Sequence, residues 1–255
     1  MKLFYRESGE GDPLLILHGL FGSSDNWQTL AKKFALKFRV FTIDLRNHGR
    51  SFHHSEFDYD VMMRDINEFI QDKRLGRVSL LGHSMGGKLS MNYALHYPDQ
   101  VRQLMVVDIA PRQYQVLHDG IILALKSLDL SLYKKREEVD DALSGWIQNS
   151  AIRQFLLKNL KRDRHGFFEW KINLDVIDHN IQNLVIEISS TRPFPGKTLF
   201  IAGEKSDYIR PVDEEQILKL FPRAMIRYLP GVGHWVHAQA PHLLFQTVLD
   251  FTENN

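Results

Sequence analysis

Apolar residues in this chain occur in short continuous runs that alternate with longer segments of mixed polarity. Continuous runs are typical of strands buried on both faces of a parallel sheet, and they lie at residues 14–17, 40–43, 78–81, 104–107 and 198–202. Residues 224–229 are predicted to form a final strand. The segments between them have helical spacing and predict helices at residues 27–38, 59–75, 88–96, 211–221 and 241–252. This alternation predicts an α/β fold with a mostly parallel central sheet flanked by helices.

The strand pattern stops after Pro111 and resumes only at residue 198. The intervening apolar residues predict helices at 113–129, 135–149, 151–161 and 173–189, with a brief extended piece at 166–170. We therefore expect residues 1–111 and 195–255 to form the core. Residues 112–194 are expected to form a helical cap, or lid, that packs over the edge of the sheet.

Composition narrows the class of protein. The chain has 255 residues, with 32 Lys and Arg against 31 Asp and Glu, so bulk charge predicts no binding to nucleic acid or a membrane surface. Cysteine is absent, which excludes disulfides, thiolate nucleophiles and Cys-ligated metals. The N-terminus lacks the apolar stretch of a signal peptide, and no run reaches the ~18 residues of a membrane span. We expect a cytoplasmic protein without a membrane span.

A Gly-x-Ser-x-Gly motif, formed by Gly82, Ser84 and Gly86, follows the predicted strand at 78–81 and precedes a predicted helix. This is the context that the motif needs. A serine on so tight a turn has strained backbone angles, and glycines on either side let the strand and the helix approach closely. The turn exposes the Ser84 hydroxyl at the edge of the sheet and predicts a nucleophile.

A serine hydroxyl needs a base to remove its proton. His234 lies in a glycine-flanked turn after the last predicted strand, where a loop reaches the carboxyl edge of the sheet, the edge at which Ser84 emerges. We expect His234 to be the base. His83 is expected to point away from Ser84, and His18 to organise its own loop.

The base requires a carboxylate that orients it. Asp108 and Asp207 both follow predicted strands in the right region, and the residues alone leave both open. The usual arrangement of such a fold places the acid near Asp207. Asp44 also ends a strand, but it precedes Ser84 in the chain and is expected to organise a loop.

Ester cleavage also requires donors to the developing oxyanion. We expect one to be the backbone amide of Met85, at the N-terminus of the helix after Ser84. The second is expected from Leu20 or Phe21, in the loop after the first long strand.

The sequence predicts neither a metal nor a cofactor. His48, His53 and His54 are close together, but no HExxH or His-x-His pattern accompanies them. The glycines near residues 9–12 and 82–87 form neither a P-loop nor a dinucleotide-binding motif.

Five stretches carry a resemblance to a known family. They are His-Gly-Leu-Phe-Gly-Ser at 18–23, Asp-Leu-Arg-Asn-His-Gly at 44–49, Gly-His-Ser-Met-Gly-Gly-Lys at 82–88, Val-Asp-Ile-Ala-Pro at 107–111 and Gly-His-Trp-Val-His-Ala at 233–238. Together they resemble the α/β-hydrolase superfamily, and more narrowly the small bacterial esterases and thioesterases of the YbfF type and their mitochondrial relatives. The resemblance implies an α/β-hydrolase fold with a helical cap, Ser84 as nucleophile and His234 as base. In the YbfF-type group it implies Asp108 as the acid, whereas the wider superfamily keeps its acid at the place of Asp207. We therefore expect Asp108 to be the acid, with Asp207 as the alternative.

These observations predict a serine hydrolase that cleaves a small-molecule carboxylic ester or acyl thioester. The aromatic residues expected to wall its acyl pocket are Phe21, Trp27, Tyr114, Trp146 and Trp235. A first alternative is a lyase or carbon–carbon bond hydrolase on the same fold, like the cyclohexadiene carboxylate synthase of the menaquinone pathway. That interpretation would be favoured if Arg46, Arg50 and Arg112 faced a polyanionic substrate. A second alternative is a binding module without turnover.

Overall fold

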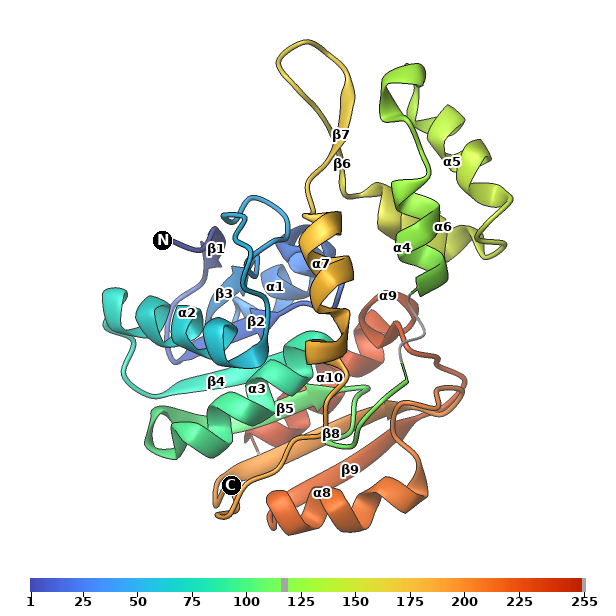
Figure 1. The fold of residues 1–255 in the computed structure, drawn as a ribbon. Helices are drawn as coiled ribbons and strands as arrows, with labels where there is room; N and C mark the ends of the chain where they lie inside the picture. Colours follow the sequence, from blue (N-terminus) through green and yellow to red (C-terminus); the bar gives the residue numbers. More distant parts are fainter. Residues whose placement is uncertain (116–118, 254–255) are drawn as a thin grey trace.

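The structure, a computed structural model, describes residues 1–115 and 119–253. A seven-stranded sheet runs through it in the order β1-β3-β2-β4-β5-β8-β9 (Figure 1). β1 pairs antiparallel with β3, and the other neighbours pair in parallel. The strands are β1 (Tyr5–Ser8), β2 (Pro13–Leu17), β3 (Arg39–Ile43), β4 (Val78–His83), β5 (Val101–Val107), β8 (Lys197–Gly203) and β9 (Ala224–Leu229). The predicted α/β fold with a mostly parallel sheet is confirmed.

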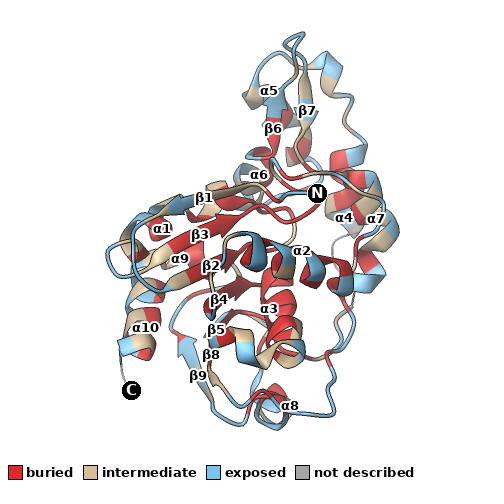
Figure 2. Ribbon diagram, turned by 90° about the vertical axis from the view of Figure 1, so that its left-hand side faces the viewer, coloured by how far each residue is buried: buried red, intermediate tan, exposed pale blue. Residues whose placement is uncertain are grey.

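Helices cover both faces of this sheet. Side chains of β2 alternate between the two faces of the sheet. Leu15 and Leu17 pack in the cluster with α2, α3 and α8. Leu14 and Ile16 pack in the cluster with α1 and α10. Figure 2 shows the buried strands lying between these layers. The helices are α1 (Gln28–Phe34), α2 (Tyr59–Asp72), α3 (Met85–His96), α8 (Glu214–Leu220), α9 (Val236–Gln239) and α10 (Pro241–Glu253). Because both faces are buried, the inner strands contain runs of apolar residues, whereas most positions of the edge strand β9 are exposed or intermediate in burial.

The core differs from the sequence-based expectation at its edges. β1 was not expected, because Tyr5–Ser8 is a polar edge strand without an aliphatic run. The helix expected at residues 27–38 is a 3₁₀ turn at Ser24–Trp27 followed by α1, which ends at Phe34. The apolar residues after Phe34 are in turns that lead into β3, so helical spacing continued beyond the helix itself.

Between β5 and β8 the chain forms shorter elements than expected; in Figure 1 most of them lie above the core, and α7 descends beside it. They are α4 (Asp119–Lys126), α5 (Arg136–Ser144), α6 (Ser150–Leu157), β6 (Leu160–Arg162), β7 (Phe168–Trp170) and α7 (Leu174–Asn180), with 3₁₀ turns at Leu130–Leu132 and Ile181–Leu184. The helix predicted at 151–161 is wrong at its end, because residues 160–162 pair with β7 in an antiparallel hairpin. The first predicted helix, 113–129, lies partly outside the described residues. We keep the name cap for residues 112–194.

Backbone bonds close the cap at its base. The amide of Tyr114 donates to the Val185 carbonyl at 2.8 Å, and the amide of Ile188 donates to the Pro111 carbonyl at 2.7 Å. The two connections to the core therefore run side by side. On the cap itself, the buried Asn159 side chain donates to the Phe21 carbonyl at 2.8 Å, which fixes the cap to the loop after β2.

Buried histidines hold the loops at the carboxyl edge of the sheet. His18 Nε2 accepts from the Leu45 amide at 3.0 Å, and His48 Nε2 accepts from the Phe21 amide at 3.3 Å. These bonds join the loop after β2 to the loop after β3 in both directions. The expectation that His18 organises its loop is confirmed.

Asp44 acts on the same two loops. Its carboxylate is buried and accepts from the amide of Ser24 at 2.6 Å and from the amide of Arg50 at 2.9 Å. Gly49 has φ +59° and packs directly against this carboxylate, so a side chain there would collide with it. Asp44 is therefore the loop organiser that the sequence predicted.

Within residues 1–115 and 119–253, none of the helices combines the length and the apolar character that crossing a bilayer requires.

We predict that Gly86→Ala destabilises the protein, whereas Gly145→Ala does not. A Cβ at Gly86 would meet the backbone oxygens of Leu17 and His18, while a Cβ at Gly145 would meet nothing within 4 Å. Overpacking against backbone typically costs about 1–3 kcal/mol. Urea denaturation of both variants measures the difference. Equal free energies of unfolding would contradict the close approach of β2 and α3.

We also predict that stability falls between pH 7 and pH 5. Burial lowers the pKa of His18 to about 4 and the pKa values of His48 and His237 to about 3. The folded protein keeps these rings neutral, whereas the unfolded chain takes up protons near pH 6.5. Their contribution is therefore complete above pH 6.5 and is lost as the pH falls, by up to ~2 kcal/mol per group at pH 5.

Urea denaturation at pH 5, 6 and 7 tests this. His237→Phe keeps a ring on Trp27, against which His237 stacks at 4.8 Å, but removes one titrating group. In this variant the loss of unfolding free energy between pH 7 and pH 5 should be smaller by the contribution of one histidine. A free energy of unfolding that is constant from pH 5 to pH 7 would refute the prediction.

Candidate active site

Ser84 lies in the turn between β4 and α3. Its backbone has φ 51° and ψ −117°, which is the strained geometry that the motif predicted. A Cβ at Gly82 would collide with the backbone of Gly86, so glycine is required for strand and helix to come this close. Only 8% of Ser84 is exposed.

Strained backbone gathers at this edge of the sheet. Four non-glycine residues with positive φ each follow one of four parallel strands: Phe21 after β2, Asn47 after β3, Ser84 after β4 and Asp108 after β5. Such conformations cost of order 1–3 kcal/mol each and persist where the surroundings enforce them. Of the five described non-glycine residues with positive φ, only Arg74, after α2, lies away from this edge, and such clustering is typical of a functional site.

Asp108 is fully buried and accepts three hydrogen bonds. Its Oδ1 accepts from the Gly203 amide at 2.9 Å, and its Oδ2 accepts from the Ser206 hydroxyl and from His234 Nδ1, the latter at 2.8 Å. A buried carboxylate is tolerated when it is bonded in this way. Of the two aspartates that the sequence left open, the structure joins Asp108 to His234.

Asp207 lies elsewhere. It is exposed, and its backbone carbonyl accepts from the Arg112 guanidinium at 2.9 Å. The neighbouring Ser206 turns inward to Asp108 instead. The amide at the end of β8 and the Ser206 hydroxyl in the loop after it therefore both donate to Asp108.

His234 sits in the turn between β9 and α9. A carboxylate only accepts, so Nδ1 must carry the proton that it shares with Asp108, and Nε2 keeps its lone pair. The His234 carbonyl accepts from His83 Nε2 at 2.9 Å, and the Tyr208 ring stacks on the imidazole at 3.9 Å. These contacts fix the ring. Sequence reasoning missed Tyr208 and Ser206, because no pattern in the chain marks them.

The neutral ring of His83 holds the turn that contains His234. Burial lowers the pKa of His83 well below its usual value, and the neighbouring His237 and His234 lower it further. It donates to a backbone carbonyl and so acts on the position of the turn. His83 was expected to point away from Ser84, and its Nε2 is bonded to the His234 carbonyl.

The loop after β2 passes directly over Ser84. A Cβ at Gly19 would lie 2.8 Å from His83 Nδ1 and 3.2 Å from the Ser84 Cβ. Of the two expected oxyanion donors in this loop, the Phe21 amide already donates to His48. Leu20 and Met85 border the cavity at Ser84, so their amides are the better candidates.

Two cavities meet at Ser84, and both are also lined by Leu20 and Tyr208. The small cavity has a volume of about 40 Å³ and extends toward α3 and the Ile181–Leu184 turn of the cap. The large cavity has a volume of about 250 Å³ and extends toward His234 and α6. The reacting group of a substrate at Ser84 would thus have space on two sides.

Three of the five aromatic residues predicted as pocket walls line a cavity at Ser84, and two do not. Tyr114 lines the small cavity, and Phe21 and Trp235 line the large one. Trp27 and Trp146 do not fulfil the expectation: Trp27 is buried in the core beneath His237, and Trp146 is 57% exposed on the cap. Aromatic character alone could not separate wall, core and surface.

Lys88 is a buried cation on the wall of the small cavity. Its ammonium donates to the Arg112 carbonyl at 2.8 Å and to the Ile186 carbonyl, one on each connection of the cap. Burial, and secondarily the charge of Arg112, lowers the pKa of Lys88 to about 7. The side chain thus ties α3 to the base of the cap.

The arginines that would favour a polyanionic substrate have partners within the protein. Arg46 forms a buried bidentate pair with Asp65, at 2.5 and 2.7 Å. Arg112 lies 3.1 Å from the buried Asp213 carboxylate. The guanidinium of Arg50 lies over the Phe4 ring at 4.9 Å.

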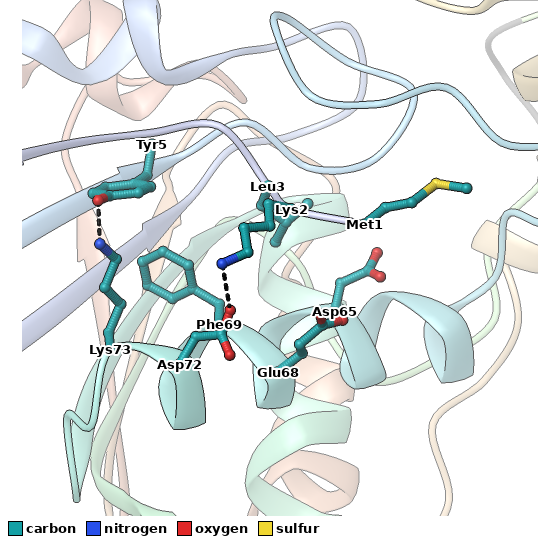
Figure 3. A pocket seen from close by; sticks show the side chains of 9 residues that line it. All are labelled: Met1, Lys2, Leu3, Tyr5, Asp65, Glu68, Phe69, Asp72 and Lys73. Atoms are coloured by element: carbon teal, nitrogen blue, oxygen red, sulfur yellow. Dashed lines mark hydrogen bonds and ion pairs between the residues drawn. The ribbon is translucent and has the colours of Figure 1, made fainter.

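A groove of about 310 Å³ lies between the N-terminal segment and α2 (Figure 3). Lys2 forms an ion pair with Asp72 at 3.3 Å, and Lys73 contacts the Tyr5 hydroxyl. Its charges are thus of both signs and partly paired with one another. The groove contains no counterpart of the Ser84–His234 arrangement among its lining residues.

His48 and His53 do not converge on a common ligand. His48 is bonded within the loops described above, and His53 Nε2 lies 3.2 Å from the Lys171 carbonyl. Among the described residues, no group of three His, Cys, Asp or Glu side chains is arranged to hold a metal ion.

Comparison with known proteins places this geometry in a family. Residues 12–129 match the α/β hydrolase fold family. The chain is 38% identical to the sn-1-specific diacylglycerol lipase ABHD11 of Xenopus laevis, covering 98% of this chain and 82% of that protein. It is 30% identical to esterase YbfF of Escherichia coli, covering 92% and 91%. Among solved structures, a marine microorganism esterase superposes with a TM-score of 0.96 at 45% identity, covering 98% and 99%.

The fold, the strained serine turn and these full-length similarities agree with one another. The chain therefore belongs to the α/β-hydrolase family, where it resembles the YbfF-type esterases and is a hydrolase of the carboxylesterase type.

Proposed function

We propose that the protein is a serine hydrolase that cleaves small-molecule carboxylic esters or acyl thioesters through an acyl-enzyme on Ser84. The observation that carries the proposal is the 2.8 Å bond between His234 Nδ1 and the buried Asp108 carboxylate, beside a serine held in a strained turn. The bond leaves Nε2 free to accept a proton, which is the state that a general base needs.

In the first half of the reaction, the Ser84 oxygen forms a bond to the acyl carbon while His234 Nε2 takes the serine proton. The bond from the acyl carbon to the leaving group then breaks. His234 returns the proton to the departing alkoxide or thiolate. Asp108 stabilises the imidazolium that exists between these two steps.

In the second half, a water molecule replaces the leaving group. His234 removes its proton, the hydroxide oxygen bonds to the acyl carbon, and the ester bond to Ser84 breaks. The proton returns to the serine oxygen, and the carboxylic acid leaves. Ser84, His234 and Asp108 are thereby restored.

The backbone amides of Leu20 and Met85 are proposed to donate to the oxyanion in both halves. Met85 is the first residue of α3, where amides lack partners within the helix and the helix dipole favours negative charge. Loss of one such donor typically costs about 3 kcal/mol of transition-state stabilisation.

Esters are the preferred substrate class because relatives matched over 82% or more of their length are named esterases and lipases. The alternative of a lyase or carbon–carbon bond hydrolase loses its support, since Arg46 and Arg112 are engaged with Asp65 and Asp213. A binding module without turnover would not need a histidine oriented by a buried carboxylate, as His234 is by Asp108.

We predict that a fluorophosphonate reacts with the wild-type protein at Ser84 and not with Ser84→Ala. Intact-protein mass spectrometry measures the added phosphonyl group, and peptide mapping locates it. Hydrolysis of p-nitrophenyl acetate should fall by about 10⁴-fold or more in Ser84→Ala. Undiminished hydrolysis in that variant would refute the nucleophile.

Asp108→Asn and Asp207→Asn distinguish the two candidate acids. The amide introduced by Asp108→Asn would face His234 Nδ1 and favour the wrong tautomer of the ring, so kcat should fall by about 10³–10⁴-fold. Asp207→Asn is the matched control on an exposed residue and should change kcat by less than about twofold. Circular dichroism verifies that both variants fold. A large loss in Asp207→Asn with an active Asp108→Asn would reverse the assignment.

A further inference from the structure

We infer that the two cavities at Ser84 divide the substrate: the small cavity takes the acyl chain and the large cavity takes the leaving group. The enzyme is then specific for short acyl chains on large, apolar alcohols or thiols. This inference rests on the proposed acyl-enzyme mechanism and extends it to substrate class.

The position of His234 determines which cavity serves which half. The imidazole must protonate the leaving atom, so the leaving group has to lie on its side of Ser84. His234 lines the large cavity together with Trp235 and His237. Met85, a proposed oxyanion donor, lines the small cavity. The acyl chain, attached to the carbon that Ser84 holds, therefore extends away from His234 and into the small cavity.

The volume of the small cavity limits the acyl chain. One water-sized group requires about 10–15 Å³ of such space, so about 40 Å³ admits three or four heavy atoms. Acetyl to butyryl groups fit, with the carbonyl carbon at Ser84. The large cavity, at about 250 Å³, offers room for a group several times that size.

The walls of the small cavity are tied in place. The Tyr59 hydroxyl donates to the Leu184 carbonyl at 2.9 Å, and the Tyr114 hydroxyl donates to the Tyr208 carbonyl at 2.5 Å. Lys88 adds its bonds to the base of the cap. These bonds hold the side chains of Tyr59, Tyr114 and Lys88 in place around the small cavity, so the space beside them is restricted.

The large cavity has a different kind of wall. The cap contributes Ile152 and Leu156 from α6, and the Phe155 ring packs against Trp235 at 4.7 Å. Aromatic and branched side chains suit flat or branched apolar groups. We therefore expect aromatic or branched leaving groups, such as benzyl or naphthyl, to be accepted.

Two ester series test the assignment on the wild-type enzyme. With p-nitrophenol as a constant leaving group, kcat/KM should fall about tenfold or more between the butyrate and the octanoate. With butyrate as a constant acyl group, kcat/KM should not fall between the ethyl, benzyl and naphthylmethyl esters. Octanoates cleaved as well as butyrates, or a steep loss with the larger alcohols, would overturn the inference.

A matched pair of buried leucines tests it again. Leu184→Ala enlarges the small cavity and should move the preferred acyl length upward by two or more carbons. Leu156→Ala enlarges the large cavity and should leave the acyl-length profile unchanged while altering the preference among alcohols. If Leu156→Ala instead shifts the acyl length and Leu184→Ala the alcohol preference, the large cavity takes the acyl chain and the inference is wrong. Alkylphosphonate esters of increasing length give the same comparison in wild type, as rates of covalent labelling without turnover.

The failure of this inference can be distinguished from failure of the proposed function. If Ser84 is labelled and esters are cleaved but the profiles are reversed, only the division of the cavities is wrong. If neither labelling nor cleavage of any ester occurs, the acyl-enzyme mechanism itself is wrong.

Discussion

The site depends on keeping one charged carboxylate in the interior. Asp108 is fully buried, and such a group is stable only while donors surround it. One donor comes from the end of β8, one from the loop after β8, and one from the turn after β9. A single residue at the end of β5 thus draws together segments that are distant in sequence. The imidazole beside Ser84 is oriented as part of the same arrangement that makes the buried charge acceptable.

Much of the core could be predicted because parallel strands are buried on both faces and read as aliphatic runs. The elements that escaped prediction lack that signal. β1 is a polar edge strand, and the β6–β7 hairpin has only three residues in each strand. The cap helices were predicted too long, because apolar residues at helical spacing also occur in the turns between them. Packing, more than propensity, decides where these helices end.

The reacting residues could be located because each has a local marker: glycines around Ser84 and a glycine-flanked turn at His234. The choice of acid had no such marker, since Asp108 and Asp207 both end strands. Their difference lies in burial and in long-range partners, which depend on how the loop after β8 folds. Trp27 and Trp146 were wrongly expected in the pocket for a similar reason: the type of a side chain does not reveal whether it faces the core, a cavity or the solvent.

The cap enters the chain after Ser84 and Asp108 and before His234, and its two ends meet at the Tyr114–Val185 and Ile188–Pro111 bonds. The two connections therefore lie side by side, and further bonds, such as those from Asn159 to the Phe21 carbonyl and from Tyr59 to the Leu184 carbonyl, join the cap to the core. Cap residues line both cavities at Ser84. Substitutions in these cap residues would therefore change the space around Ser84 while leaving the bond between Asp108 and His234 in place.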